Sequence, residues 1–217
     1  MRSTLGSRLP SVADGAAGDE YLVRPARLLD YRSWRATRMA NERRLAPAFG
    51  SPDRLWSALN TRSAWLERFG PVPGLSRRGR SLTYVVVARD PRGHERIVGE
   101  VGIRGVDPVT ASGEISVWAT DLPDAVMPWA TASLVAAAFA SEHRLDRVVA
   151  PVARNNPGPC RMFEAVGMER RAVRRSLREY DGAPRDHDIW VIENTPATRA
   201  ALHDLAADSA PGACSGD

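Results

Sequence analysis

The sequence predicts an α/β fold: a mixed, mostly antiparallel central sheet flanked by helices, with one parallel β-α-β unit. Two observations carry this prediction. Most of the β-like runs are separated by tight turns, which bring consecutive strands together antiparallel. Residues 113–167 instead read as strand, loop, helix, strand and helix, the order of a parallel crossover. With 217 residues, the chain is expected to form a single domain over residues 20–208.

The first third of the chain is expected to be helical after one short strand. Residues 1–19 are small and polar without periodicity, which predicts a disordered arm. A strand is expected over residues 21–24. Apolar residues at helical spacing then predict one helix over residues 28–45, capped by Asp30, and a second over residues 51–69.

An antiparallel run follows a loop at residues 70–81. The pattern predicts strands over residues 82–89 and 97–106, joined by a turn at residues 90–93. A further turn leads into a strand over residues 114–119. The arginines of the loop are read as a solvated charge cluster, with phosphate or acidic peptide as the alternative.

The parallel unit begins with the strand at residues 114–119. An alanine-rich helix is expected to open at Pro128, because proline is favoured at the first position of a helix. A strand over residues 147–153 follows, and then a short helix after Asn156 that closes at Gly167. The N-terminus of such a crossover helix is a natural place to hold an anion.

The C-terminal part is expected to be a hairpin followed by a helix. Strands are predicted over residues 170–179 and 186–192, joined by the turn Asp181-Gly182. Thr195 is expected to cap a helix that runs to residue 205, and residues 209–217 are expected to be disordered.

Composition indicates an ordinary soluble protein, 43% hydrophobic and 26% charged. The longest apolar run, residues 134–140, is too short to span a bilayer, and the N-terminus lacks the apolar stretch of a signal peptide. We therefore expect a cytoplasmic protein. Cys160 and Cys214 form neither a disulfide framework nor a metal set. The net charge of +4 is carried by arginine alone, and it permits an acidic partner such as RNA without demonstrating one.

Several short motifs occur in a familiar order. They are Glu114-Ile115-Ser116-Val117-Trp118, Ala130-Thr131, Asn156, Gly167-Met168 and Arg185-Asp186-His187. The series resembles the GNAT acyltransferases, and within them the type that acetylates the N-termini of ribosomal proteins. The resemblance runs from about residue 21 to residue 192. It implies a GNAT-like fold, acetyl-CoA as co-substrate, and direct attack of an α-amino group on the thioester in a ternary complex.

The resemblance also implies site residues and partners. Glu114 matches the glutamate that accepts the amine proton. The residues implied to contact the cofactor are Val117, Trp118, Ala119, Trp129, Ala130, Thr131 and Asn156. No metal is implied. The acceptor would be the N-terminus of a protein or peptide, a ribosomal protein being one candidate. We expect no DNA or membrane partner, and either a monomer or a homodimer.

Each of these assignments has an alternative. Glu114 would also suit an exposed strand start, Trp118 a core aromatic residue, and Asn156 a helix cap. His143 and His187 are weaker candidates for the base: His143 reads as a helix C-terminal cap, and His187 as a residue satisfied by Asp186.

The phosphate loop departs from the family pattern. The two loop glycines of the family fall at Val126 and Pro128. Valine resists positive φ, and proline has no N–H to donate. No arginine occurs between residues 105 and 142, whereas Asp121 and Asp124 flank the loop. The loop is therefore either remodelled or unable to bind the cofactor.

The position of the general acid departs as well. Phe163 replaces a tyrosine of many members, and Pro159 replaces the serine of the ribosomal-protein type. Cys160, Tyr180 or water remain as proton donors. Two other functions stay open: a degenerate, non-catalytic interaction module, and an acetyltransferase for a small amine.

Overall fold

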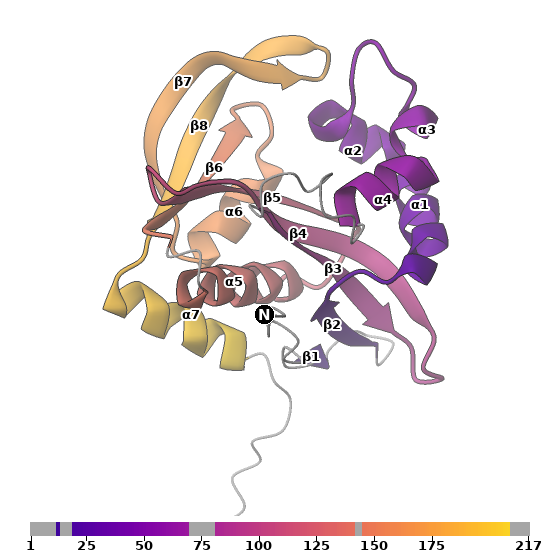
Figure 1. Cartoon of the computed structure of the whole chain (residues 1–217), viewed down its shortest axis with the longest axis horizontal. Helices are drawn as coiled ribbons and strands as arrows, with labels where there is room; N and C mark the ends of the chain where they lie inside the picture. The colour runs from indigo at the N-terminus through magenta and orange to yellow at the C-terminus, as the bar shows by residue number, and fades with distance from the viewer. Residues whose placement is uncertain (1–11, 14–18, 70–80, 142–144, 209–217) are drawn as a thin grey trace, which may run out of the picture.

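The computed structural model of the chain describes residues 12–13, 19–69, 81–141 and 145–208. Eight strands form one sheet in the order β1-β2-β3-β4-β5-β6-β8-β7 (Figure 1). The strands are β1 Val12–Ala13, β2 Glu20–Arg24, β3 Leu82–Arg89, β4 Glu95–Asp107, β5 Ser112–Ala119, β6 Arg147–Ala153, β7 Glu169–Tyr180 and β8 Ala183–Glu193. Every neighbouring pair is antiparallel except β5 and β6, which run parallel, so the expected fold class is confirmed.

Helices cover both faces of the sheet. They are α1 Tyr31–Ala40, α2 Glu42–Phe49, α3 Trp56–Leu59, α4 Arg62–Phe69, α5 Val126–Ala140, α6 Gly158–Ala165 and α7 Pro196–Asp208, with a 3-10 turn η1 at Leu28–Asp30. The N-terminal helices α1–α4 lie on one side, and α5 and α7 lie on the other (Figure 1). Strand β3 is buried by both layers: Val85 and Val87 pack under the N-terminal helices, whereas Val86 packs with α5.

Helix α5 is the crossover of the parallel unit. It is apolar all round, as expected of a helix buried on every side; the sheet and α7 enclose it. It begins at Val126 and not at Pro128, because the N–H of Val126 already bonds the carbonyl of Pro123 at 3.0 Å. Pro128 therefore lies inside the first turn, where a missing N–H breaks no helical hydrogen bond.

The predicted N-terminal elements need three corrections. Within the arm expected to be disordered, Val12–Ala13 forms a strand that pairs with β2. The single helix expected over residues 28–45 is broken at Asn41, whose side-chain amide bonds the carbonyl of Thr37 at 2.9 Å and so ends α1. Asp30 does not cap α1 with its side chain, because its carboxylate binds the guanidinium of Arg24 at 2.7 Å.

The helix expected over residues 51–69 is two helices, α3 and α4. Its first residues instead form a bridged turn between Ser51 and Arg54. Helix α4 begins directly after Thr61, whose hydroxyl accepts a hydrogen bond from the N–H of Ala64 at 3.3 Å. The expected loop at residues 70–81, except Ser81, and the expected tail at residues 209–217 lie outside the described residues, as does His143.

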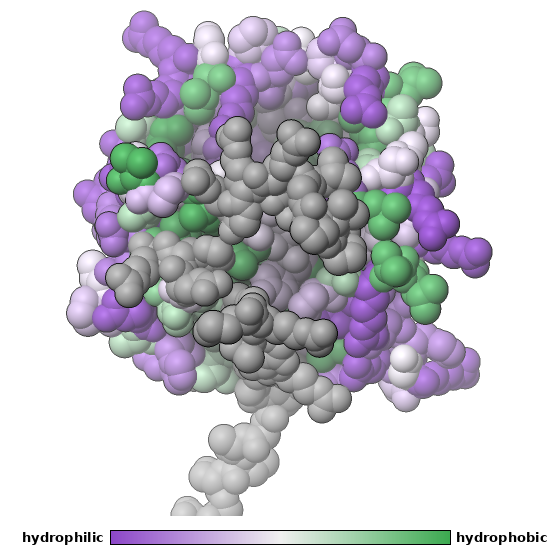
Figure 2. Space-filling model, viewed as in Figure 1, coloured by the Kyte–Doolittle hydropathy of each residue, from purple (hydrophilic) through white to green (hydrophobic). Residues whose placement is uncertain are grey.

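The C-terminal hairpin and helix agree with expectation. Asp181 and Gly182 both have positive φ, 54° and 72°, as a two-residue turn between twisted strands requires. The hydroxyl of Thr195 accepts the N–H of Thr198 at 3.1 Å and caps α7. Where described residues are visible on the face that Figure 2 shows, many are hydrophilic. No helix in the described ranges is long and apolar enough to cross a membrane.

Candidate active site

A cleft of about 150 Å³ lies where β5 and β6 separate. The parallel pairing of these strands starts at Ser112 and Arg147 and ends at Glu114 and Val149. Beyond Glu114 the strands diverge, and side chains from the end of α2, the start of α6 and the β7–β8 hairpin close the gap. The cleft therefore collects residues from five separate segments of the chain.

Backbone donors point into this gap. The N–H of Thr120 bonds the carbonyl of Val98 on β4 at 2.8 Å. Since backbone groups alternate direction along a strand, the N–H groups of Val117 and Ala119 point away from β4, toward the side where β6 has left. Such N–H groups can polarise a carbonyl oxygen regardless of the side chains they carry.

Glu114 lies in the cleft as an ion pair. Its two carboxylate oxygens accept hydrogen bonds from Arg178 on β7 at 2.6 Å and 2.5 Å, and this bond raises the pKa of Arg178. The carboxylate is about one-third exposed, at 32%. Each oxygen has a second lone-pair site, so the pair leaves acceptor capacity for an amine or a water molecule. The role of Glu114 as base stays a prediction.

Tyr180 and His187 line the same cleft. Burial, and secondarily the charge of Asp181, raises the pKa of the Tyr180 phenol, so it is protonated at neutral pH. The Nδ1 of His187 lies 2.8 Å from the carbonyl of Arg185. A carbonyl only accepts, so Nδ1 carries the proton and Nε2 is the basic nitrogen of the neutral ring.

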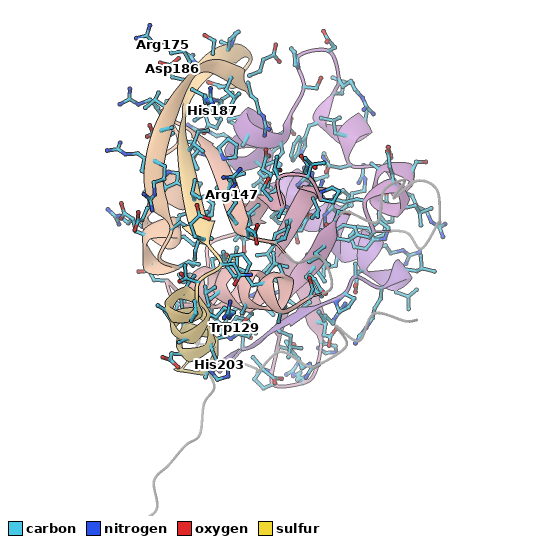
Figure 3. The ribbon with its side chains drawn as sticks, turned by 60° about the vertical axis from the view of Figure 1, so that its left-hand side comes forward. Trp129, Arg147, Arg175, Asp186, His187 and His203 are labelled. Atoms are coloured by element: carbon cyan, nitrogen blue, oxygen red, sulfur yellow. The ribbon has the colours of Figure 1, made fainter. Side chains whose placement is uncertain are left out.

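The prediction that Asp186 is the hydrogen-bond partner of His187 is therefore wrong. Asp186 instead accepts the N–H of Ser176 at 3.0 Å. Successive residues of a strand point to opposite faces, which separates the side chains of Asp186 and His187 (Figure 3).

A second pocket, of about 640 Å³, lies between the N-terminal ends of α5 and α6. Its donors are few. In the first turn of α5 the N–H groups of Val126 and Trp129 bond the carbonyls of Pro123 and Ala125. Pro128 has no N–H, which leaves the N–H of Met127 for a ligand.

The side chains of this second pocket supply cations that the phosphate loop lacks. Arg161 on α6 and Arg44 on α2 line it, together with Asp121 and Asp124. Arg44 is held by Asp121 at 2.5 Å. Arg161 was missed from the sequence because it lies 33 residues beyond Pro128 in the chain. The sequence feature that could have revealed Arg161 is its position in the first turns of α6, one residue beyond the Pro159-Cys160 pair.

The residues implied to contact the cofactor divide into two groups. Val117 and Asn156 line the cleft, and Ala119 lines the second pocket. Asn156 lies two residues before α6, whose cap is Pro157, so it does not cap that helix. The other four side chains are buried, with Trp129, Ala130 and Thr131 at 0% exposure and Trp118 at 4%.

These four side chains belong to the core. Trp129 lies within α5 (Figure 3). Trp118 packs with the aromatic residues of the N-terminal helices, and its Nε1 donates to Glu100 at 3.0 Å. Trp118 therefore agrees with the alternative interpretation, that of a core aromatic residue. A cofactor role for any of the four stays a prediction and would have to act through backbone or packing.

Comparison with protein families identifies the chain. Residues 21–169 match the model of the acetyltransferase (GNAT) domain. The chain belongs to this family. Comparison with curated protein sequences gives no match.

Solved structures share the fold. RimJ of Mycobacterium smegmatis, in complex with CoA-disulfide, superposes with a TM-score of 0.74 at 23% identity, covering 94% of each chain. The ribosomal-protein-S5-alanine acetyltransferase of Vibrio fischeri gives 0.68 at 21% identity, covering 81% of this chain and 94% of that one. A spermidine N-acetyltransferase of Vibrio cholerae, with CoA and spermine, gives 0.62 at 14%, covering 83% and 98%.

Acetyl-CoA is the co-substrate of GNAT acetyltransferases, and the two pockets of this chain fit it in unequal degree. The N–H groups of Val117 and Ala119 suit a thioester arm between the strands. At the phosphate end, Arg161 and the N–H of Met127 would hold the anion. The described residues contain no cluster of histidine, cysteine, aspartate or glutamate that could hold a metal ion.

Proposed function

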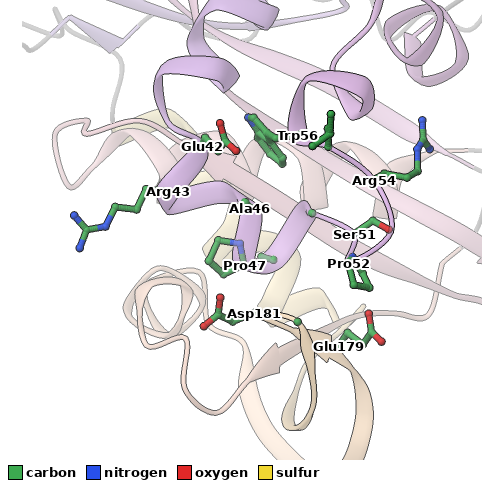
Figure 4. A pocket seen from close by; sticks show the side chains of 14 residues that line it. Glu42, Arg43, Ala46, Pro47, Ser51, Pro52, Arg54, Trp56, Glu179 and Asp181 are labelled. Atoms are coloured by element: carbon green, nitrogen blue, oxygen red, sulfur yellow. The ribbon is translucent and has the colours of Figure 1, made fainter.

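We propose that this acetyltransferase transfers the acetyl group to the α-amino group of a protein or peptide. The observation that carries the proposal is a pocket of about 520 Å³ that adjoins the cleft, since both are lined by Ala48 and Glu179. Figure 4 shows α2 and the β7–β8 hairpin facing each other across this pocket. The N–H of Asp181 bonds the carbonyl of Pro47 at 2.9 Å, which closes one end.

This entrance suits a chain end better than a free polyamine. Three carboxylates line it, from Glu42, Glu179 and Asp181, but Arg43 and Arg54 line it as well. A polycation would favour an entrance of one sign. A peptide presents one ammonium at its end and neutral backbone behind it, which a mixed lining accommodates.

Residues of the cleft can then be assigned to the steps of acetyl transfer. Acetyl-CoA, when bound, supplies the thioester that the amine attacks. Val117 and Ala119 would stabilise the developing oxyanion through their N–H groups. Glu114, directly or through water, would take the proton of the amine, with the Nε2 of His187 as the other base in the cleft. The phenol of Tyr180 would return a proton to the leaving thiolate.

The non-catalytic alternative has one specific observation in its favour. The first turn of α5 offers few N–H donors, and Asp121 and Asp124 lie beside it. An interaction module that kept the fold would not need those donors.

Calorimetric titration with acetyl-CoA separates the two functions. Binding in the micromolar range, followed by mass-spectrometric detection of acetylated N-terminal peptides, would support the enzyme. No heat of binding at millimolar acetyl-CoA would contradict it and favour the interaction module.

A further inference from the structure

A basic pocket of about 540 Å³ lies on the side of the N-terminal helices, away from α5. It is formed by α1, α4, the ends of α2 and α3, the turn at Arg54 and neighbouring residues of β3 and β4. Four arginines line it, namely Arg38, Arg54, Arg68 and Arg104. Arg54 also lines the acceptor entrance, whereas the other three have no part in the acetyl transfer described above.

Arg38 is the most buried of the four, with 4% exposure. Its guanidinium lies between four aromatic rings, 4.7 Å from the centre of Trp56 and 5.3 Å from that of Trp118. Its Nε donates to the neutral amide of Asn60 at 2.5 Å, and its Nη1 is buried with no hydrogen-bond partner among the described residues. Desolvation, and then the charge of Arg68, lowers the pKa of Arg38 to about 10.

The buried carboxylate behind the pocket is already engaged. Glu100, 1% exposed, accepts hydrogen bonds from the Nε of Arg68 at 2.6 Å and from Arg104 at 3.3 Å. It also accepts hydrogen bonds from the Nε1 of Trp118 at 3.0 Å and from the Nη2 of Arg68. One buried carboxylate thus bonds two guanidinium groups, whereas Arg38 interacts with its charge but makes no hydrogen bond to it.

The charges around the pocket do not balance. Its lining holds four arginines and Glu67, and Glu100 lies behind it, so the net charge is 4 − 2 = +2. Buried positive charge without a counter-charge is costly unless an anion from outside supplies it.

The basic pocket adjoins the catalytic cleft. Phe49, at the end of α2, lines both. Its ring lies 5.6 Å from the guanidinium of Arg38. A carboxylate in the pocket and an amine in the cleft would therefore both lie beside Phe49, so that one peptide segment could reach both.

We propose that this pocket binds an acidic side chain of the acceptor, so that the enzyme selects N-termini with aspartate or glutamate close to the acetylated residue. The selection rests on the proposed acetylation of an α-amino group. The pocket would recognise a carboxylate through its guanidinium groups. Of the arginines bonded to Glu100, Arg104 is the most accessible.

Peptides that differ at one residue test this proposal. A series with Glu, Gln or Lys at each of the second to fourth positions is titrated into the protein, with binding measured by fluorescence anisotropy and turnover by acetyl transfer. At one of these positions we expect the peptide with Glu to bind about tenfold tighter than the peptide with Gln, because a hydrogen bond to a charged group contributes this much to the affinity. Arg104→Gln should remove the preference.

Arg96→Gln is the matched control. Arg96 lies on the same strand, exposed and paired with Asp19 at 3.0 Å, outside the basic pocket. It should keep the preference for Glu. Equal binding of Glu and Gln peptides to the unaltered protein, or loss of the preference in both variants, would overturn the proposal.

Two further outcomes separate this proposal from the function on which it rests. If peptides with Glu bind selectively but none is acetylated, the acidic subsite stands and the acetylation proposal fails. If inorganic phosphate binds and Arg104→Gln weakens it, while the peptides show no preference, the pocket is an anion site of another kind and the acceptor subsite is refuted.

Discussion

The two ends of the site are built differently. At the gap between β5 and β6 the catalytic features come largely from backbone direction and strand separation, and substitutions such as Ser116 and Val117 leave them in place. At the N-terminus of α5 the binding features depend on individual N–H groups, and Pro128 removes one outright. The comparison teaches that features set by strand geometry tolerate side-chain changes, whereas a site made of individual N–H groups is altered by a single proline.

The largest expected effect is at the gap. Glu114→Gln should lower kcat near neutral pH by about a hundredfold or more if this carboxylate is the base. Acetyl-CoA affinity, measured by calorimetry, should hardly change. Glu169→Gln is a matched control, because Glu169 is also paired with an arginine, Arg171 at 2.8 Å, but lies at the far end of β7. Unchanged kcat in Glu114→Gln would transfer the base role to His187.

A smaller effect is expected from Tyr180→Phe. Loss of the acid should lower kcat about tenfold, since water can also return the proton. Burial raises the phenol's pKa above its ordinary value of 10.0, so the acid stays protonated through neutral pH and is lost only as the pH rises through the raised value. A pH–rate profile whose alkaline limb is the same in both proteins would exclude this role.

At the other end of the site, Arg161→Ala tests the anion-binding side chain. We expect acetyl-CoA affinity to fall about tenfold, with kcat at saturation nearly unchanged, because a charged hydrogen bond is lost in binding alone. Arg171→Ala, at an exposed residue of β7, is the control. If both variants bind acetyl-CoA equally well, Arg161 does not hold the phosphate.

The smallest effect is expected from returning a donor to α5. Pro128→Ala restores one N–H at the helix N-terminus and should tighten acetyl-CoA binding by about threefold to tenfold. Val126→Gly is not the equivalent experiment. Val126 has 0% exposure, so its removal should cost about 2–4 kcal/mol of unfolding free energy, measurable by denaturant titration. Weaker binding in Pro128→Ala would mean that the proline shapes the pocket.

Local patterns predicted the strands well and the N-terminal helices poorly. The strand expected over residues 147–153 coincides with β6, because apolar alternation between turn residues is a local signal. The break at Asn41 and the restart at Thr61 depend on single side-chain hydrogen bonds, which periodicity does not contain.

The site was predicted in part. Glu114, Val117 and Asn156 do meet at the cleft. Tyr180 and Arg161 join the two pockets from segments far away in the chain. Ala130 and Thr131 match the family motif, and their side chains are buried, so their predicted contact with the cofactor would have to be made through the backbone or packing.

The sequence by itself determined the fold class and the family, because both follow from the order and spacing of short motifs along the chain. Only the tertiary structure decided which side chains share a pocket. The ion pair of Glu114 with Arg178 and the approach of Arg38 and Arg68 to Glu100 join residues far apart in sequence. Chain folding creates such neighbourhoods, and the charge balance within them depends on three-dimensional distance.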